Sequence, residues 1–119
     1  MARILVVEDD GDLQFLYNKL LTSMGHDIVG ARRTADAILH LTNDEFDLVI
    51  LDMNMPDMPG LRVIEFAHDD IRLRQIPVVV ISANENWQAQ AQALGVQYFH
   101  VKPVTMQALS ALVNAALAS

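Results

Sequence analysis

Four short apolar stretches of this chain end in polar residues of the kinds that carry out chemistry. Carboxylates follow residues 4–7 and residues 48–51, a hydroxyl follows residues 78–81, and a lysine follows residues 98–101. If these stretches are strands of one parallel sheet, their carboxyl ends meet at one edge, where such sheets bind ligands. The residues that would meet there are Glu8, Asp9, Asp10, Asp52, Ser82 and Lys102.

This group of side chains fits metal-assisted phosphoryl transfer. Carboxylates that lie close together repel one another, which raises their pKa values. A divalent cation relieves the repulsion, and oxygen ligands favour magnesium over softer metals. A carboxylate such as Asp52 can act as a nucleophile and form an acyl phosphate. Lys102 can neutralise charge on the phosphoryl oxygens and Ser82 can donate a hydrogen bond, so the set needs little beyond correct positioning.

The elements that would position these residues alternate between strands and helices. The apolar residues of 4–7, 48–51 and 78–81 are continuous, which is typical of strands covered on both faces. Weaker strands are expected at 26–31 and 98–101. Helices are expected at 13–24, after Thr34 as a cap, at 61–68, at 85–94 and at 105–118. This alternation predicts an α/β fold with right-handed crossovers.

Size and composition limit the other possibilities. The 119 residues fit one domain, and 52% of them are hydrophobic. The net charge of −7 and the lack of a basic stretch argue against direct binding to nucleic acid. The absence of cysteine excludes disulfides and thiolate ligands. No apolar run is long enough to cross a membrane and the acidic N-terminal residues do not fit a signal peptide, so we expect a cytoplasmic protein with no membrane partner.

Four motifs taken together resemble a known family. ILVVEDD, LVILDMNMPDMPG, VVVISA and VKP occur in this order, each at a predicted strand end, and they extend over essentially the whole chain. The sequence is similar to the receiver domain of two-component response regulators, the CheY-like family. The resemblance implies that residues 1–119 form a single receiver domain. It also implies a doubly wound (βα)5 flavodoxin-like α/β fold, in which a five-stranded parallel sheet in the order 2-1-3-4-5 carries helices on both faces.

The resemblance assigns roles to the residues at the strand ends. It implies that Asp52 accepts a phosphoryl group from the phosphohistidine of a sensor histidine kinase or, in a phosphorelay, of a phosphotransfer protein. Glu8, Asp9, Asp52 and the backbone carbonyl of Asn54 would hold Mg²⁺. The resemblance further implies that Ser82 hydrogen-bonds the phosphoryl group and that Lys102 pairs with it. It also implies that the Lys102–Pro103 peptide bond is cis.

The function implied is a signalling switch and not metabolic catalysis, because the domain would catalyse only its own phosphorylation and dephosphorylation. Phosphate on Asp52 would draw in Ser82 and let Phe99 turn inward. Phe99 stands where the family often has tyrosine, and the interval from Ser82 to Lys102 is shorter than in many receivers. The fourth helix, fifth strand and fifth helix would present the changed surface to an effector domain or protein, and a homodimer through this face stays open.

Two other functions also stay open. The chain could be an interaction module that keeps the fold but does not need phosphate. It could instead be a Mg²⁺-dependent phosphohydrolase with Asp52 as the nucleophile, although Asn54 stands where a nearby general acid would be expected. Asp10 and Asp12 are interpreted either as helix caps or as further metal contacts. Dinucleotide binding is excluded because no G-x-G-x-x-G follows the first strand.

Overall fold

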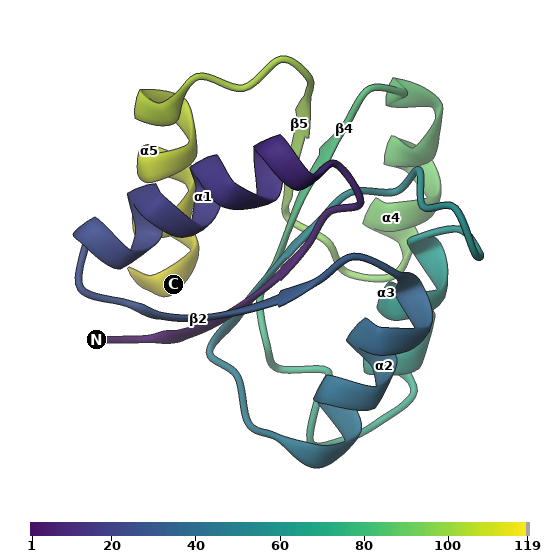
Figure 1. Cartoon of the computed structure of the whole chain (residues 1–119). Coiled ribbons are helices and arrows are strands. Elements are labelled where there is room, and N and C mark those ends of the chain that lie inside the picture. Colours follow the sequence, from purple (N-terminus) through teal and green to yellow (C-terminus); the bar gives the residue numbers. More distant parts are fainter. Residues whose placement is uncertain (119) are drawn as a thin grey trace.

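The continuous apolar runs form the interior of a five-stranded parallel sheet (Figure 1). The computed structural model describes residues 1–118. The strands are β1 (Arg3–Val7), β2 (Asp27–Ala31), β3 (Leu48–Leu51), β4 (Val78–Ser82) and β5 (Tyr98–Val101), in the order β2-β1-β3-β4-β5. The predicted order of the sheet is therefore confirmed.

Helices cover both faces of this sheet. They are α1 (Gly11–Ser23), α2 (Thr34–Asn43), α3 (Leu61–His68), α4 (Gln88–Ala93) and α5 (Met106–Ala118), and a 3-10 turn, η1 (Glu85–Trp87), precedes α4. α1 and α5 pack on one face, whereas α2, α3 and α4 pack on the other (Figure 1). Within residues 1–118, none of these helices combines the length and the apolar character that crossing a membrane requires.

Alternate residues of the central strands belong to two separate cores. Leu5 and Val7 of β1 are in the core beneath α2, α3 and α4, whereas Ile4 and Val6 are in the core beneath α1 and α5. Successive side chains of a strand point to opposite faces of the sheet, so a strand that is covered on both sides needs apolar residues at every position. This requirement explains the unbroken apolar runs in the sequence.

The strand order reverses between β1 and β3. The chain runs from β1 outward to β2 and then returns to β3 on the other side of β1. α1 follows β1 on one face of the sheet, and α3 follows β3 on the opposite face. The two connections therefore diverge at the carboxyl ends of β1 and β3, and a crevice of this kind is where doubly wound sheets bind ligands.

Two local predictions need correction. α2 begins at Thr34, so Thr34 is not its cap, and Arg33 in the cap position makes no side-chain capping bond. The N–H groups of Thr34 and Ala35 are bound instead by the carboxylate of Asp57, which lies far along the chain. The helix predicted at 85–94 is divided into η1 and the short α4, because the Asn84 side chain accepts from the Asn86 N–H and starts a 3-10 turn.

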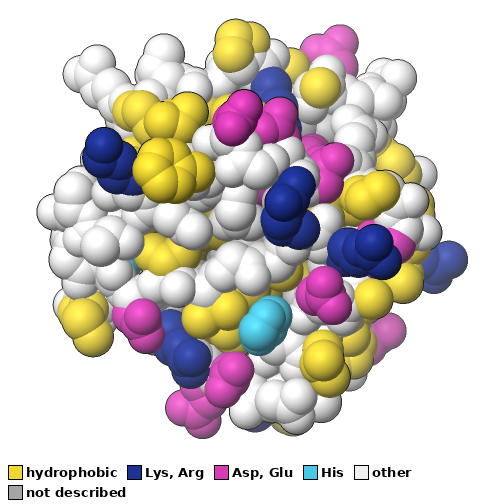
Figure 2. All heavy atoms as spheres, viewed as in Figure 1, with side chains coloured by type: hydrophobic (Ala, Val, Ile, Leu, Met, Phe, Trp, Pro, Cys, Tyr) yellow, Lys and Arg dark blue, Asp and Glu magenta, His cyan; other side chains and the backbone are white. Residues whose placement is uncertain are grey.

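The surface mixes side chains of all types. On the face shown in Figure 2, Lys and Arg side chains are scattered among acidic and apolar ones and form no continuous basic patch. Several large apolar side chains of the described residues are exposed, among them Phe15 and Leu16 on α1.

Candidate functional site

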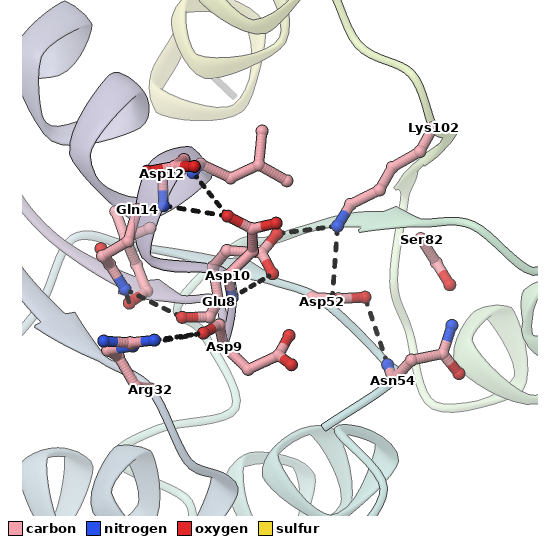
Figure 3. A network of polar contacts seen from close by, with 12 residues as sticks. Glu8, Asp9, Asp10, Asp12, Gln14, Arg32, Asp52, Asn54, Ser82 and Lys102 are labelled. Carbon is pink, nitrogen blue, oxygen red and sulfur yellow. Dashed lines mark hydrogen bonds and ion pairs between the residues drawn. The ribbon is translucent and has the colours of Figure 1, made fainter. Parts of the chain in front are cut away.

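Three carboxylates meet at the carboxyl ends of β1 and β3. Glu8 and Asp9 directly follow β1, and Asp52 directly follows β3. Val7 pairs with Leu51 in the sheet, so the register places these acids side by side. Each of the three offers one carboxylate oxygen, and these oxygens all lie within 4.8 Å of one another. The structure thus brings together three of the predicted metal ligands (Figure 3).

Lys102 is the cation that lies between two of these acids. Its Nζ donates to Glu8 Oε1 at 2.8 Å and to Asp52 Oδ2 at 3.4 Å. Glu8 and Asp52 are only 2% and 5% exposed, so this ammonium group offsets buried negative charge. Figure 3 shows the lysine side chain reaching from its place after β5 toward both carboxylates.

Burial disturbs the ionisation of this group. Burial raises the pKa of Glu8 to about 7, and the nearby Asp52 charge adds to the rise, while Lys102 opposes it. Burial by itself would lower the pKa of Lys102, but the hydrogen bond to Glu8 and the charges of Asp52 and Glu8 raise the pKa overall. The predicted rise in pKa is therefore found at Glu8, which Lys102 neutralises only in part.

The donor set fits a magnesium ion. The three carboxylates supply hard oxygen ligands, and one ammonium group does not balance their charge. Asn54 lies next to them, because its N–H donates to Asp52 Oδ1 at 3.2 Å and turns the chain immediately after the strand. The role of the Asn54 carbonyl as a fourth ligand stays a prediction.

Gly60 holds the loop after Asp52 close to the strand end. Its N–H donates to the Met53 carbonyl at 2.8 Å. A Cβ at this position would overlap the Asp52 carbonyl oxygen and would lie 2.8 Å from Met53 Cα. Glycine is thus required here for space, and Met53 is completely buried beneath the loop.

The other two predicted residues lie at the ends of neighbouring strands, with Ser82 as the last residue of β4 and Lys102 directly after β5. The Lys102 N–H donates to the Ser82 carbonyl at 2.8 Å, which extends the ladder between β4 and β5. Ser82 is fully buried, and its Oγ accepts from the Asn84 N–H at 3.2 Å. The Lys102–Pro103 peptide bond is cis, which confirms that prediction.

Phe99 and Tyr98 point to opposite faces of β5. Phe99 pairs with Val80 and packs, half-buried, against the core beneath α2, α3 and α4, which also holds Trp87. Tyr98 packs against the core beneath α1 and α5, and its hydroxyl donates to the Ala115 carbonyl at 3.3 Å. Tyr98 therefore cannot replace Phe99 in the predicted switch.

The open interpretation of Asp10 is resolved by its contacts. Its Oδ1 accepts from the N–H groups of Asp12 and Leu13 at 2.9 and 3.1 Å, so Asp10 is the N-cap of α1. Its side chain faces the helix and not the three clustered acids (Figure 3). Asp12 lies in the first turn of α1, where an acidic residue also favours the helix.

Three residues near the site were missed by the sequence reasoning. Arg32 donates to the Asp9 carbonyl, and Asp57 accepts from the start of α2. The Gln14 amide lies between the ends of β1 and β2 and donates to the carbonyls of both strands. Each contact joins a side chain to the backbone of a distant segment, which leaves no periodic signal in the sequence.

Comparisons with known proteins agree with this geometry. A family model described as the response regulator receiver domain matches residues 4–114. Two-component response regulator ORR24 of Oryza sativa subsp. indica is 36% identical over 90% of this chain and 17% of its own length. The virulence transcriptional regulatory protein PhoP of Salmonella typhimurium is 31% identical over 97% of this chain and 51% of its own length. The chain thus spans about half of the length of PhoP and less than a fifth of the length of ORR24.

A solved structure shows the same fold. The response regulator TrrA of Thermotoga maritima, crystallised in complex with Mg(2+)-BeF, is 26% identical to this chain. It superposes with a TM-score of 0.87 over 98% of this chain and 100% of its own. The family match, the relatives and the common fold agree, and the chain belongs to the response regulator receiver domain family of two-component systems.

Proposed function

We propose that residues 1–119 act as one phosphorylation-controlled receiver domain in which Asp52 is the phosphoacceptor. The observation that carries this proposal is the position of Asp52. It is a nearly buried carboxylate at the sheet edge, with Glu8 and Asp9 beside it and Lys102 within reach. A carboxylate so placed can act as a nucleophile while its charge is balanced from several sides.

In the proposed reaction, a carboxylate oxygen of Asp52 attacks the phosphorus of a phosphohistidine on a sensor kinase or phosphotransfer protein. The new oxygen–phosphorus bond forms while the phosphorus–nitrogen bond breaks, and the leaving imidazole keeps the electron pair. In the later dephosphorylation, water attacks the phosphorus of the acyl phosphate, and the products are the Asp52 carboxylate and inorganic phosphate. Asn54 orients the acceptor, because its N–H already holds Asp52 Oδ1.

The side chains around Asp52 divide the remaining work. Glu8, Asp9, Asp52 and the Asn54 carbonyl would hold Mg²⁺, which when bound supplies positive charge to the phosphoryl oxygens. The Lys102 ammonium group, 3.4 Å from Asp52 Oδ2, pairs with the same oxygens after transfer. The Ser82 hydroxyl, at the end of the neighbouring strand β4, donates to the phosphoryl group.

The proposed output is a change in the face formed by α4, β5 and α5. Movement of Ser82 toward the phosphoryl group would open space beneath β4, into which half-buried Phe99 turns. That change would alter the surface that an effector domain or partner protein contacts, or through which two copies pair. The relative PhoP is a transcriptional regulatory protein of about twice this length, which supports an attached or separate effector as the partner.

The test is phosphorylation by a small phosphodonor. The protein is incubated with Mg²⁺ and acetyl phosphate, and its intact mass is measured with and without chelator. We expect a gain of one phosphoryl group that requires Mg²⁺ and is lost in Asp52→Asn. A gain that survives Asp52→Asn would refute the assignment of the acceptor, and no gain in the wild type would favour the phosphate-independent module. Repeated turnover of phosphate esters would instead favour the phosphohydrolase.

A further inference from the structure

The segment of residues 32–35, which consists of the connection after β2 and the first two residues of α2 and is called the connection below, contacts both loops that carry the acidic cluster. On one side it binds the loop after β1 through Arg32, and on the other it binds the loop after β3 through Thr34 and Ala35. We infer that Arg32 and Asp57 are positioning residues, which use this connection to set the distance between Asp9 and the loop that holds Asn54. The inference rests on the proposed function, since it concerns the cation and phosphoryl site.

The first contact fixes the backbone of Asp9. Arg32 donates from both Nε and Nη2 to the Asp9 carbonyl, at 3.2 and 2.9 Å. The guanidinium group lies beside Gly11, where a Cβ would be 3.4 Å from Nη2, an ordinary van der Waals contact. Figure 3 shows Arg32 pointing at Asp9 from outside the acidic cluster. Two donors on one acceptor restrict the direction of the Asp9 peptide more than one flexible donor would.

The second contact fixes the loop after Asp52. The two carboxylate oxygens of Asp57 accept from the Thr34 and Ala35 N–H groups, each at 3.0 Å. The Thr34 hydroxyl donates back to the Met58 carbonyl at 2.9 Å, and Thr34 is completely buried. Asp57 thus caps α2 from another loop and places a negative charge at the helix N-terminus, where it is stabilising. The hydrogen bond from Ala35 contributes most to lowering the pKa of Asp57, so the carboxylate remains ionised.

The connection is itself anchored to the sheet, so it can act as a fixed spacer. The Glu8 N–H donates to the Ala31 carbonyl at 3.0 Å, immediately before residues 32–35 begin. Gln14 donates from Nε2 to the carbonyls of Val6, Glu8 and Ala31 at 3.2–3.3 Å and joins the same strand ends. Movement of residues 32–35 would therefore move both loops relative to the strands.

Such positioning matters for a magnesium site because Mg²⁺ demands near-octahedral geometry and tolerates little displacement of its ligands. Residues that orient metal ligands without touching the metal typically change its affinity by about 10–100-fold when they are mutated. We expect Arg32→Gln and Asp57→Ala each to weaken Mg²⁺ binding about tenfold. Asp57→Asn keeps one acceptor oxygen and should lose less affinity than Asp57→Ala.

Matched controls separate positioning from simple structural support. Asp70 accepts from the Arg72 N–H at 2.8 Å, and Arg72 donates to the Leu41 carbonyl at 2.6 Å. Each is likewise a bond between a side chain and a backbone group, but the Asp70 bond is local to the turn after α3, and the Arg72 bond holds the far end of α2. Asp70→Ala and Arg72→Gln should therefore lower stability without changing Mg²⁺ affinity by more than about twofold.

Two measurements test the inference. Calorimetric titration gives the Mg²⁺ affinity of each variant, and amide hydrogen exchange of the chelator-treated protein gives the protection of the Asn54 N–H, which donates to Asp52 Oδ1. We expect Asp57→Ala to lower that protection about tenfold, whereas Asp70→Ala leaves it unchanged. Unchanged protection and unchanged affinity in both Arg32→Gln and Asp57→Ala would overturn the inference. A wild type that binds no Mg²⁺ and accepts no phosphate would refute the proposed function instead, and the exchange measurement would still decide whether residues 32–35 position the loop.

Discussion

Replacing Gly60 with alanine should damage the site without removing any reactive group. Gly60 has a φ of −58°, a conformation that alanine adopts freely. The requirement for glycine comes from space, because a Cβ would overlap the Asp52 carbonyl oxygen and approach Met53 Cα to 2.8 Å. Both neighbours are backbone atoms, so no side-chain rotation can relieve the overlap.

The size of the effect follows from this distance. Non-bonded carbon atoms prefer a separation of about 3.5–4.0 Å, so the start of α3 must move by roughly 1 Å relative to Asp52. A displacement of about 1 Å near a reacting group can cost about 10²-fold in rate. Overpacking costs about 1–3 kcal/mol, and no helix propensity is regained, because Gly60 is the N-cap of α3, where glycine is preferred to alanine. We expect Gly60→Ala to be about 10²-fold slower in phosphorylation and ~1–3 kcal/mol less stable.

The assay compares the rate of mass gain from acetyl phosphate with the free energy of unfolding in urea. Gly95→Ala is the matched control, because Gly95 has a φ of 94° and no atom lies within 4 Å of its would-be Cβ. Alanine there strains the backbone by about 1 kcal/mol far from the acids, and the phosphorylation rate should not change. If Gly60→Ala is phosphorylated within twofold of the wild-type rate, the close approach of Gly60 to the Asp52 backbone does not control the geometry of the site.

Four further predictions concern the charged residues in and beside the site. Because burial raises the pKa of Glu8 from 4.5 to about 7, ionising it costs folding free energy that accumulates as the pH rises from about 4.5 to about 7 and is complete above that range. Glu8→Gln should therefore raise the free energy of unfolding by ~2 kcal/mol at pH 8, and the gain should shrink as the pH falls toward 5 in urea titrations. Mg²⁺ should raise the melting temperature of the wild type more at pH 8 than at pH 6, since at the lower pH protons compete with Mg²⁺ for the Glu8 carboxylate. Equal shifts of the melting temperature at the two pH values in calorimetric scans would contradict this. Lys102→Ala should slow phosphorylation by acetyl phosphate about 10²-fold. It should also tighten Mg²⁺ binding in calorimetric titration, because the lysine competes with the metal for the acids. Weaker Mg²⁺ binding would show that Lys102 supports the acids instead. Asp10→Ala should cost about 1 kcal/mol as a lost helix cap while the phosphorylation rate is retained, and a slower rate would place Asp10 in the site.

The fold and the acidic cluster could be predicted because both depend on strong patterns. Unbroken apolar runs identify strands that are covered on both faces, and the alternation with helices makes the strands parallel. Once strands are parallel, a residue that directly follows a buried run must lie at the common edge. Glu8, Asp52 and Ser82 are placed by that rule alone, and the pairing of Val7 with Leu51 then brings the acids together.

The remaining contacts could not be predicted because residue type and spacing do not determine them. Thr34 is a good capping residue by type, yet the cap of α2 is Asp57, which follows in a loop with no periodicity. An arginine beside another arginine gives no sign that Arg32 reaches the Asp9 carbonyl. These bonds depend on how loops from different strands meet, and only the assembled sheet defines that arrangement.

Lys102 links the charge balance of the site to its proposed chemistry. Its Nζ is 2.8 Å from Glu8 and 3.4 Å from Asp52, so the shorter of its two bonds serves Glu8, the acid whose pKa is raised to about 7. A phosphoryl group on Asp52 would add negative oxygens on the side of the longer bond. One ammonium group cannot neutralise both fully, and leaving Glu8 ionised and unpaired in a buried position is costly. The lysine can therefore turn to the phosphoryl group only when Glu8 is protonated or held by another cation. The charge state of Glu8, and not that of Asp52 alone, would therefore set the stability of the phosphorylated domain.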